Sequence, residues 1–289
     1  MEQREAIHIL TFAIILIISC IISYSIGKYS NLLKPNFVCH EICNIEQLPN
    51  TDSVLLKYGL SSGYNLRYMD DFLISYDTKN RIPFWVLETI SINNLIRIEN
   101  NYRKNKRFTV DKYFYKPFQS TLEDYKKSGY DRGHMAAAGN YLHSKSTMMK
   151  TFLLSNIAPQ VGKGFNQGIW TELENKIRNV IQSEIYKSAH ILTGPLFVPK
   201  EIKYENKTIF MMEYEMLRRN VAVPTHFFKV VIFTDKSNKI SYMSFVMPNA
   251  IINGTIESYY RNISDIEKLA GFRIFPKIDF FKIKNKITF

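Results

Sequence analysis

Hydrophobic and polar positions divide the chain into an apolar N-terminal run, an irregular stretch and a long region of mixed strand-like and helix-like segments. The run Ile9–Ile26 holds 18 residues without a charge, which is just long enough for a helix to cross a bilayer core. A cleaved signal is usually shorter and a transit peptide is Arg-rich, whereas here Glu2 and Glu5 flank Arg4. We expect an uncleaved transmembrane helix, with residues 1–28 as membrane anchor or targeting segment.

Residues 29–56 contain Pro35, Pro49, several Asn and no clear period, which predicts a linker before a domain of residues 57–289. Within that domain, runs rich in β-branched and aromatic residues and bounded by Asn, Asp, Gly or Pro predict strands. The predicted strands are Phe72–Tyr76, Phe84–Ile90, Phe108–Val110, Phe152–Ser155, His190–Phe197, Phe210–Met216, Ala222–Phe233 and Tyr242–Met247.

The clearest predicted helix starts near Asn166, because apolar residues recur after it at steps of three and four. Shorter helices are predicted at Thr121–Lys127 and Ile263–Leu269. Strands and helices mix without regular alternation, so the pattern predicts an α+β domain with a mainly antiparallel sheet.

Composition narrows the class of protein. Of 289 residues, 46% are apolar and 22% charged, which excludes wholesale disorder and fibrous repeats. Lys and Arg number 38 against 26 Asp and Glu, a formal charge of +12. That surplus favours a polyanionic partner such as nucleic acid or an acidic membrane. Three cysteines exclude a disulfide-stapled scaffold.

The segment SGYDRGHMAAAGN, residues 128–140, carries the first candidate chemistry. His134 can take a proton near neutral pH. Arg132 offers a planar fork that suits phosphate oxygens, and Gly133 lets the chain approach a ligand closely. An isolated His is more often an ordinary core or surface residue, so this segment alone leaves the function open.

A second set of candidate residues lies in the segment SNIAPQVGKGFNQGIWTELE, residues 155–174. Asn166 and Glu174 are eight residues apart, about two helical turns. An amide oxygen with a nearby carboxylate can hold a hard cation that keeps most of its water, as Mg²⁺ prefers. Asn is also a favoured N-cap, so Asn166 could simply begin the helix. The residues alone do not decide between these readings.

Both segments resemble the signature of the DNA/RNA non-specific endonucleases, the ββα-metal nucleases with a DRGH motif, and within them the mitochondrial endonuclease G branch. The resemblance extends from Lys57 to about Pro276. It is carried further by KYGLSSG from Lys57, SYDTKNRIPFWVLE from Ser75, LTGPLFVPK from Leu192, VAVPTHFFKV from Val221 and VMPNA from Val246. It implies a ββα-metal (His-Me finger) nuclease fold with an antiparallel central sheet flanked by helices.

The resemblance also implies roles for individual residues. His134 would be the general base that activates water, and Asn166 the one direct protein ligand of Mg²⁺ or Mn²⁺. Glu174 would hold metal-bound waters, Arg132 would neutralise the phosphate, and Asn156 would support the site by hydrogen bonding.

Two further residues receive roles from the resemblance. Arg81 would be a second phosphate contact, and Asp131 would fix the turn before His134. The stretch between Asn156 and Asn166 is one residue longer than is usual in the family, at Gly162–Gly164.

The implied activity is Mg²⁺-dependent hydrolysis of DNA and RNA without sequence or sugar preference. The implied setting is a homodimer in the mitochondrion, at the inner membrane or in the intermembrane space, acting in mitochondrial DNA turnover or apoptotic DNA degradation. Two alternatives stand beside this reading. One is a catalytically silent, membrane-tethered nucleic-acid-binding module. The other is the related mitochondrial 5′-exo/endonuclease branch, which the residues after His134 also resemble.

Overall fold

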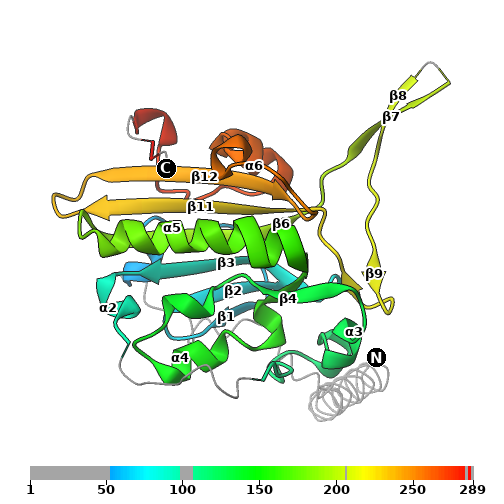
Figure 1. The fold of residues 1–289 in the computed structure, drawn as a ribbon, viewed down its shortest axis with the longest axis horizontal. Coiled ribbons are helices and arrows are strands. Elements are labelled where there is room, and N and C mark those ends of the chain that lie inside the picture. The colour runs from blue at the N-terminus through cyan, green and yellow to red at the C-terminus, as the bar shows by residue number, and fades with distance from the viewer. Residues whose placement is uncertain (1–52, 98–106, 206, 284–285, 288–289) are drawn as a thin grey trace, which may run out of the picture. The chain divides into compact units, whose positions relative to one another are not determined.

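The computed structural model of the chain describes residues 53–97, 107–205, 207–283 and 286–287 (Figure 1). The apolar run Ile9–Ile26 and nearly all of the expected linker lie outside these residues. The last linker residues are described: a short 3₁₀ turn, η2 (Val54–Leu56), buries Leu55 and Leu56 against the domain.

The structure does not support the predicted transmembrane helix. No helix in the described part of the chain is long and apolar enough to cross a membrane. The longest helix there, α5 (Thr171–Gln182), has 12 residues and an amphipathic pattern, whereas a spanning helix needs about 20 mostly apolar residues. The described residues form an α+β fold.

A six-stranded sheet forms the centre of the described domain. Each neighbouring pair in the sheet is antiparallel, which confirms the predicted mainly antiparallel architecture. Its strands, in spatial order, are β1 (Leu66–Tyr68), β2 (Phe72–Asp77), β3 (Ile82–Ile90), β6 (Tyr186–Leu196), β11 (His226–Asp235) and β12 (Ile240–Pro248).

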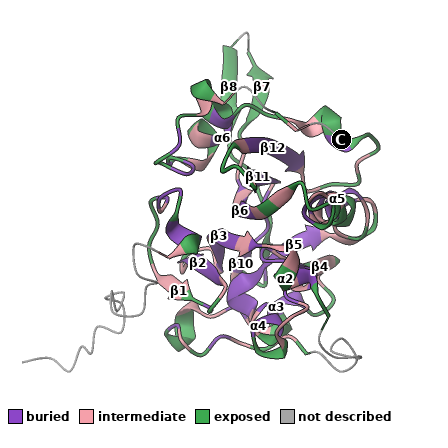
Figure 2. Cartoon of the chain, turned by 90° about the vertical axis from the view of Figure 1, so that its left-hand side faces the viewer, coloured by how far each residue is buried: buried purple, intermediate pink, exposed green. Residues whose placement is uncertain are grey.

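The sheet is buried on both faces, which explains why the residues of β11 between its two ends are all buried (Figure 2). Side chains alternate between the faces of a strand. Phe227 and Val231 belong to the core cluster under α5, whereas Phe228 and Val230 belong to a second cluster with residues of α6 (Ile263–Ala270). α5 therefore lies on one face and α6 on the other (Figure 1).

Short elements surround the sheet. A hairpin, β7 (Lys200–Tyr204) with β8 (Lys207–Met211), projects from the end of β6 (Figure 1). The helices and turns are α2 (Ile92–Leu95), η3 (Lys116–Phe118), α3 (Leu122–Tyr125), η4 (Ala138–Asn140), α4 (Lys145–Lys150), η5 (Leu154–Asn156), η7 (Ile256–Tyr259) and η8 (Phe280–Lys282). The remaining strands are the paired β9 (Met216–Leu217) and β10 (Val221–Ala222), and the pair described below.

The predicted strand Phe152–Ser155 is wrong. Leu154 and Ser155 begin the η5 turn, and Leu153 makes only an isolated bridge, to Thr109 in the predicted strand Phe108–Val110. The predicted strand Phe210–Met216 divides between β8 and β9. The apolar residues of these runs pack in the core or belong to the hairpin. Hydrophobic period and strand propensity alone do not distinguish such residues from those of a continuous strand.

Candidate active site

Two strands and a helix bring the two candidate segments together. β4 (Tyr130–His134) pairs antiparallel with β5 (Ile157–Val161), so that His134 lies opposite Ile157. The chain then runs through an irregular helical segment, η6 (Gly162–Trp170), into α5. This is the ββα arrangement that the resemblance implied.

Gly133 allows the close pairing of these strands. A Cβ at this position would lie 2.0 Å from Oε1 of Gln160 and 2.4 Å from its Cγ. Gln160 is completely buried, so its side chain has little freedom to move aside. Glycine is therefore required in the motif by packing, and the candidate base follows it directly on the strand.

His134 and Arg132 share one face of β4, because side chains two residues apart on a strand point the same way. The imidazole of His134 is half-buried against Phe152 and Phe108, with ring centroids 4.8 Å and 5.4 Å away. The guanidinium carbon of Arg132 lies 4.6 Å from the centroid of Phe108. The aromatic rings thus hold a candidate base and an exposed cation side by side.

Asn166 is fixed beside the motif by Asp131. Its Nδ2 donates to Asp131 Oδ2 at 2.8 Å, and Gln167 Nε2 donates to the same oxygen at 2.7 Å. Because the nitrogen of the Asn166 amide is held by the carboxylate, the orientation of its oxygen is set. That oxygen has no hydrogen-bond partner among the described residues and is available to a ligand.

The N-cap reading of Asn166 is wrong. Regular helix begins at Thr171, five residues later, and Trp170 is its N-cap. Between Asn166 and the helix, Gly168 has a non-helical backbone, and Gly164 before it has φ +84°. The extra residue at Gly162–Gly164 thus lies within η6. Asn166 still contacts β4, through its hydrogen bond to Asp131.

Asn156 holds the backbone that follows His134. Its Oδ1 accepts from the Ala136 amide at 2.9 Å, and its Nδ2 donates to the carbonyls of Ala136 and Thr151 at 3.0 and 2.9 Å. The side chain is fully buried. Its hydrogen bonds are to backbone, so its contribution is to hold the loop after the motif in place.

Glu174 is half-buried on α5 and interacts electrostatically with the buried side chain of Lys229. Lys229, on β11, is only 1% exposed, and its Nζ donates to Thr193 Oγ1 at 2.7 Å. Burial lowers the pKa of Lys229, while the charges of Glu174 and Glu88 act in the opposite direction. The interior of the sheet therefore supplies positive charge behind the candidate carboxylate.

Arg178 joins the site although the sequence reading did not select it. One terminal nitrogen donates to Asn140 Oδ1 at 3.0 Å and the other to Asn175 Oδ1 at 2.6 Å. Asn140, in the motif segment, in turn donates to the buried carboxylate of Glu88 at 2.9 Å. The available signal was the spacing: Arg178 follows Glu174 by four residues and so extends the same helix face.

Arg81 has a different environment from the one expected. Its guanidinium donates to the carbonyls of Pro117 at 2.9 Å and Asn220 at 2.9 Å. These bonds tie the turn between β2 and β3 to two distant loops. Contact with phosphate would require Arg81 to exchange them, so the geometry favours a structural contribution.

The donors at this site suit one kind of metal ion. The described residues contain no cluster of three or more His, Cys, Asp or Glu side chains that could enclose an ion. The oriented amide oxygen of Asn166 and the carboxylate of Glu174 are hard oxygen donors. Such a sparse set fits a cation that retains most of its water, as Mg²⁺ does.

The buried carboxylate of Glu88 predicts a pH dependence of stability. Burial raises the pKa of Glu88 to about 7, against the charge of Lys229 and hydrogen bonds from Asn140 and Tyr141. Between the ordinary value of 4.5 and about 7, the folded protein then binds more protons than the unfolded chain. The free energy of unfolding should therefore decrease as pH rises through this window.

Urea unfolding of wild type and Glu88→Gln across this window tests the prediction. The wild type should lose stability relative to the variant as pH rises. His190 and His226, whose pKa values burial lowers, are common to both proteins and cancel in the difference. Parallel stability curves would show that Glu88 does not titrate there.

Comparison with known proteins agrees with this geometry. The profile of the DNA/RNA non-specific endonuclease family matches residues 51–281. The chain is 39% identical to the mitochondrial endonuclease G of Caenorhabditis elegans over 234 residues, covering 80% of this chain and 74% of that protein. It is 34% identical to nuclease C1 of Cunninghamella echinulata var. echinulata, covering 80% of this chain and 90% of that one.

A solved structure is similar as well. The chain matches a chain of the crystal structure of an EndoG/EndoGI complex with a TM-score of 0.76 and 34% identity, over 82% of this chain and 96% of the other. These relatives are nucleases, hydrolases that act on DNA and RNA, and their family is one of metal-dependent enzymes. The match spans both candidate segments and nearly all of the described fold, and the chain belongs to the DNA/RNA non-specific endonuclease family.

Proposed function

We propose that the protein is a Mg²⁺-dependent endonuclease that hydrolyses phosphodiester bonds of DNA and RNA without reading sequence. The observation that supports this most directly is the amide of Asn166, oriented by Asp131 alongside the strand that carries His134. It joins a candidate metal ligand to a candidate base within one ββα unit. Residues 57–289 form the endonuclease domain in this proposal.

His134 acts as the general base. Its imidazole accepts a proton from the attacking water, and Phe152 and Phe108 keep the ring in a fixed orientation. Asn156 contributes indirectly, because its hydrogen bonds hold the backbone that follows His134. The neutral form of His134 is required for this step.

Negative charge on the phosphate is balanced by Arg132, on β4, and Arg178, on α5. Asn166 would hold the cation through its amide oxygen, and Glu174 would hold the water around it. When bound, Mg²⁺ would supply positive charge that offsets the negative charge developing on the phosphate. Mn²⁺ has similar ligand preferences and should substitute.

These groups contact phosphate rather than bases, so they position a strand without specifying its sequence. The formal charge of +12 fits the same substrate. Binding should weaken steeply with salt, because each phosphate contact releases counterions. We place the protein in the mitochondrion, on the names of its C. elegans and human relatives, which are 39% and 37% identical.

Circular plasmid DNA and a structured RNA, incubated with the full chain in Mg²⁺ or in chelator, test the proposal. Both substrates should be degraded in Mg²⁺ and neither in chelator. Binding without cleavage by the folded protein would favour a silent nucleic-acid-binding module. Cleavage of linear but not circular DNA would favour an exonuclease.

A further inference from the structure

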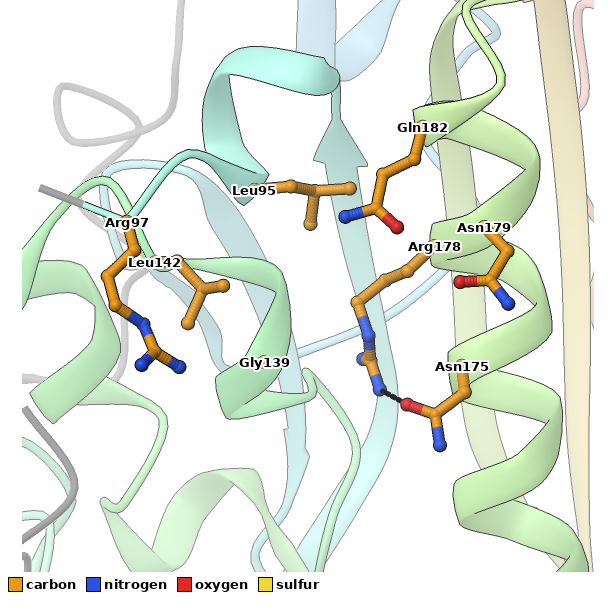
Figure 3. Close-up of a pocket in the computed structure, with 8 residues that line it drawn as sticks. All are labelled: Leu95, Arg97, Gly139, Leu142, Asn175, Arg178, Asn179 and Gln182. Carbon is orange, nitrogen blue, oxygen red and sulfur yellow. Dashed lines mark hydrogen bonds between the residues drawn. The ribbon is translucent and has the colours of Figure 1, made fainter.

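A cavity of about 260 Å³ lies along α5 and shares Arg178 and its hydrogen-bond partner Asn175 with the candidate active site. One wall is formed by Asn175, Arg178, Asn179 and Gln182, which recur at helical spacing. Figure 3 shows Arg97, Leu95 and Leu142 facing this wall from the other side. The cavity thus lies between α5, the end of α2 and the loop that follows the motif.

The lining has the chemistry of an anion site with an apolar floor. Arg97 and Arg178 supply two guanidinium groups, and α5 adds amide side chains. No acidic side chain is among the described residues that line the cavity. Leu95 is buried and Leu142 half-buried, and together they give the cavity apolar contacts that suit a sugar.

The position of the cavity relates it to the candidate active site. Arg178 lies one helical turn after Glu174, about 6 Å along the axis, and Gln182 lies one turn farther. Consecutive nucleotides in a strand rise by about 3.4 Å. A strand whose scissile phosphate is near His134 and Asn166 would therefore reach the cavity within a few nucleotides.

We propose that this cavity is a subsite for a phosphate, with its sugar, of a nucleotide that flanks the scissile bond on the substrate strand. Arg97 contacts that phosphate, Asn179 and Gln182 donate hydrogen bonds to the strand, and the two leucines pack on the sugar. The subsite rests on the proposed function for its position next to the cut. Its occupancy by nucleic acid is measurable without cleavage.

The test is binding of a fluorescent single-stranded oligonucleotide to the full chain in chelator, across a range of salt concentrations. Arg97→Gln should raise Kd about three- to fivefold and reduce the slope of log Kd against log salt by about 0.7, the value for one phosphate contact. Asn179→Asp, which adds a carboxylate to the opposite exposed wall, should also weaken binding. Both positions are exposed, so neither variant should affect folding.

Lys236→Gln is the matched control, because it removes one charge from an exposed turn between β11 and β12, outside the cavity. If Arg97→Gln binds like this control, the subsite is overturned even if the wild type cleaves DNA. If Arg97→Gln loses binding of inorganic phosphate but not of the oligonucleotide, the cavity takes free anions and the proposal is overturned. A selective loss of oligonucleotide binding supports the subsite even if no cleavage occurs.

Discussion

Replacing His134 by Ala should reduce the rate of cleavage by about 10²–10⁴-fold, the usual contribution of a positioned general base. Removing the imidazole leaves no side chain to accept the proton of the attacking water. Asn166 would stay in place because Asp131 holds its amide, and Arg178 because Asn140 and Asn175 accept from its guanidinium. Arg132 would keep its contact with the Phe108 ring. The Kd for nucleic acid in chelator should therefore change little, while kcat falls.

Two controls make this result specific. His143→Ala removes a histidine whose Nε2 lies 3.2 Å from Asp71, outside the ββα unit, and should leave cleavage intact. Added imidazole should partly restore cleavage by His134→Ala, since Phe152 and Phe108 leave a ring-shaped space. Full turnover by His134→Ala without imidazole would show that another group is the base.

Strands of the sheet with strong apolar patterns were predictable from the sequence. Phe72–Tyr76 lies within β2, which is one residue longer, and Tyr242–Met247 lies within β12. The helix at Ile263–Leu269 was also located correctly, as α6. In each of these segments, local propensity and burial favour the same structure, so the one-dimensional pattern is sufficient.

The strands that carry the candidate site were not predictable in this way. β4 is YDRGH, with a glycine and three polar residues, and β5 contains Pro159. Neither has the apolar alternation of a strand. They pair because Gly133 leaves room for the buried side chain of Gln160 and because Asn156 donates a hydrogen bond to the backbone of Ala136. These contacts join residues that are distant in the sequence, so a local pattern does not contain them.

The helix boundary was misplaced for a related reason. The helix was predicted to start near Asn166, but η6 keeps a non-helical backbone at Gly168, between Asn166 and the regular helix. The hydrogen bond between Asn166 and Asp131 joins the irregular segment to β4, so tertiary contact overrides helical propensity there. Arg178 was missed because its contact with Asn140 depends on a loop far from it in the sequence.

Replacing Asn166 by Ala should lower cleavage by about 10²–10³-fold and raise the Mg²⁺ concentration needed for half-maximal rate. The substitution removes the amide oxygen that we assign to the metal. It also removes one of the two hydrogen bonds to Asp131 Oδ2, and that second effect must be separated from the first.

Gln167→Ala separates them, because it removes the other donor to the same Asp131 oxygen, at 2.7 Å, and leaves the Asn166 amide oxygen intact. If Asn166 binds the metal, Gln167→Ala should keep the Mg²⁺ dependence of the wild type, and only Asn166→Ala should lose Mn²⁺ binding measured by electron paramagnetic resonance in the absence of substrate. If both variants lose activity equally and both still bind Mn²⁺, the function of Asn166 is to orient Asp131 and the motif strand. In that case the metal ligand must be sought elsewhere, with Glu174 the first residue to substitute because it supplies the other hard oxygen donor assigned to the site.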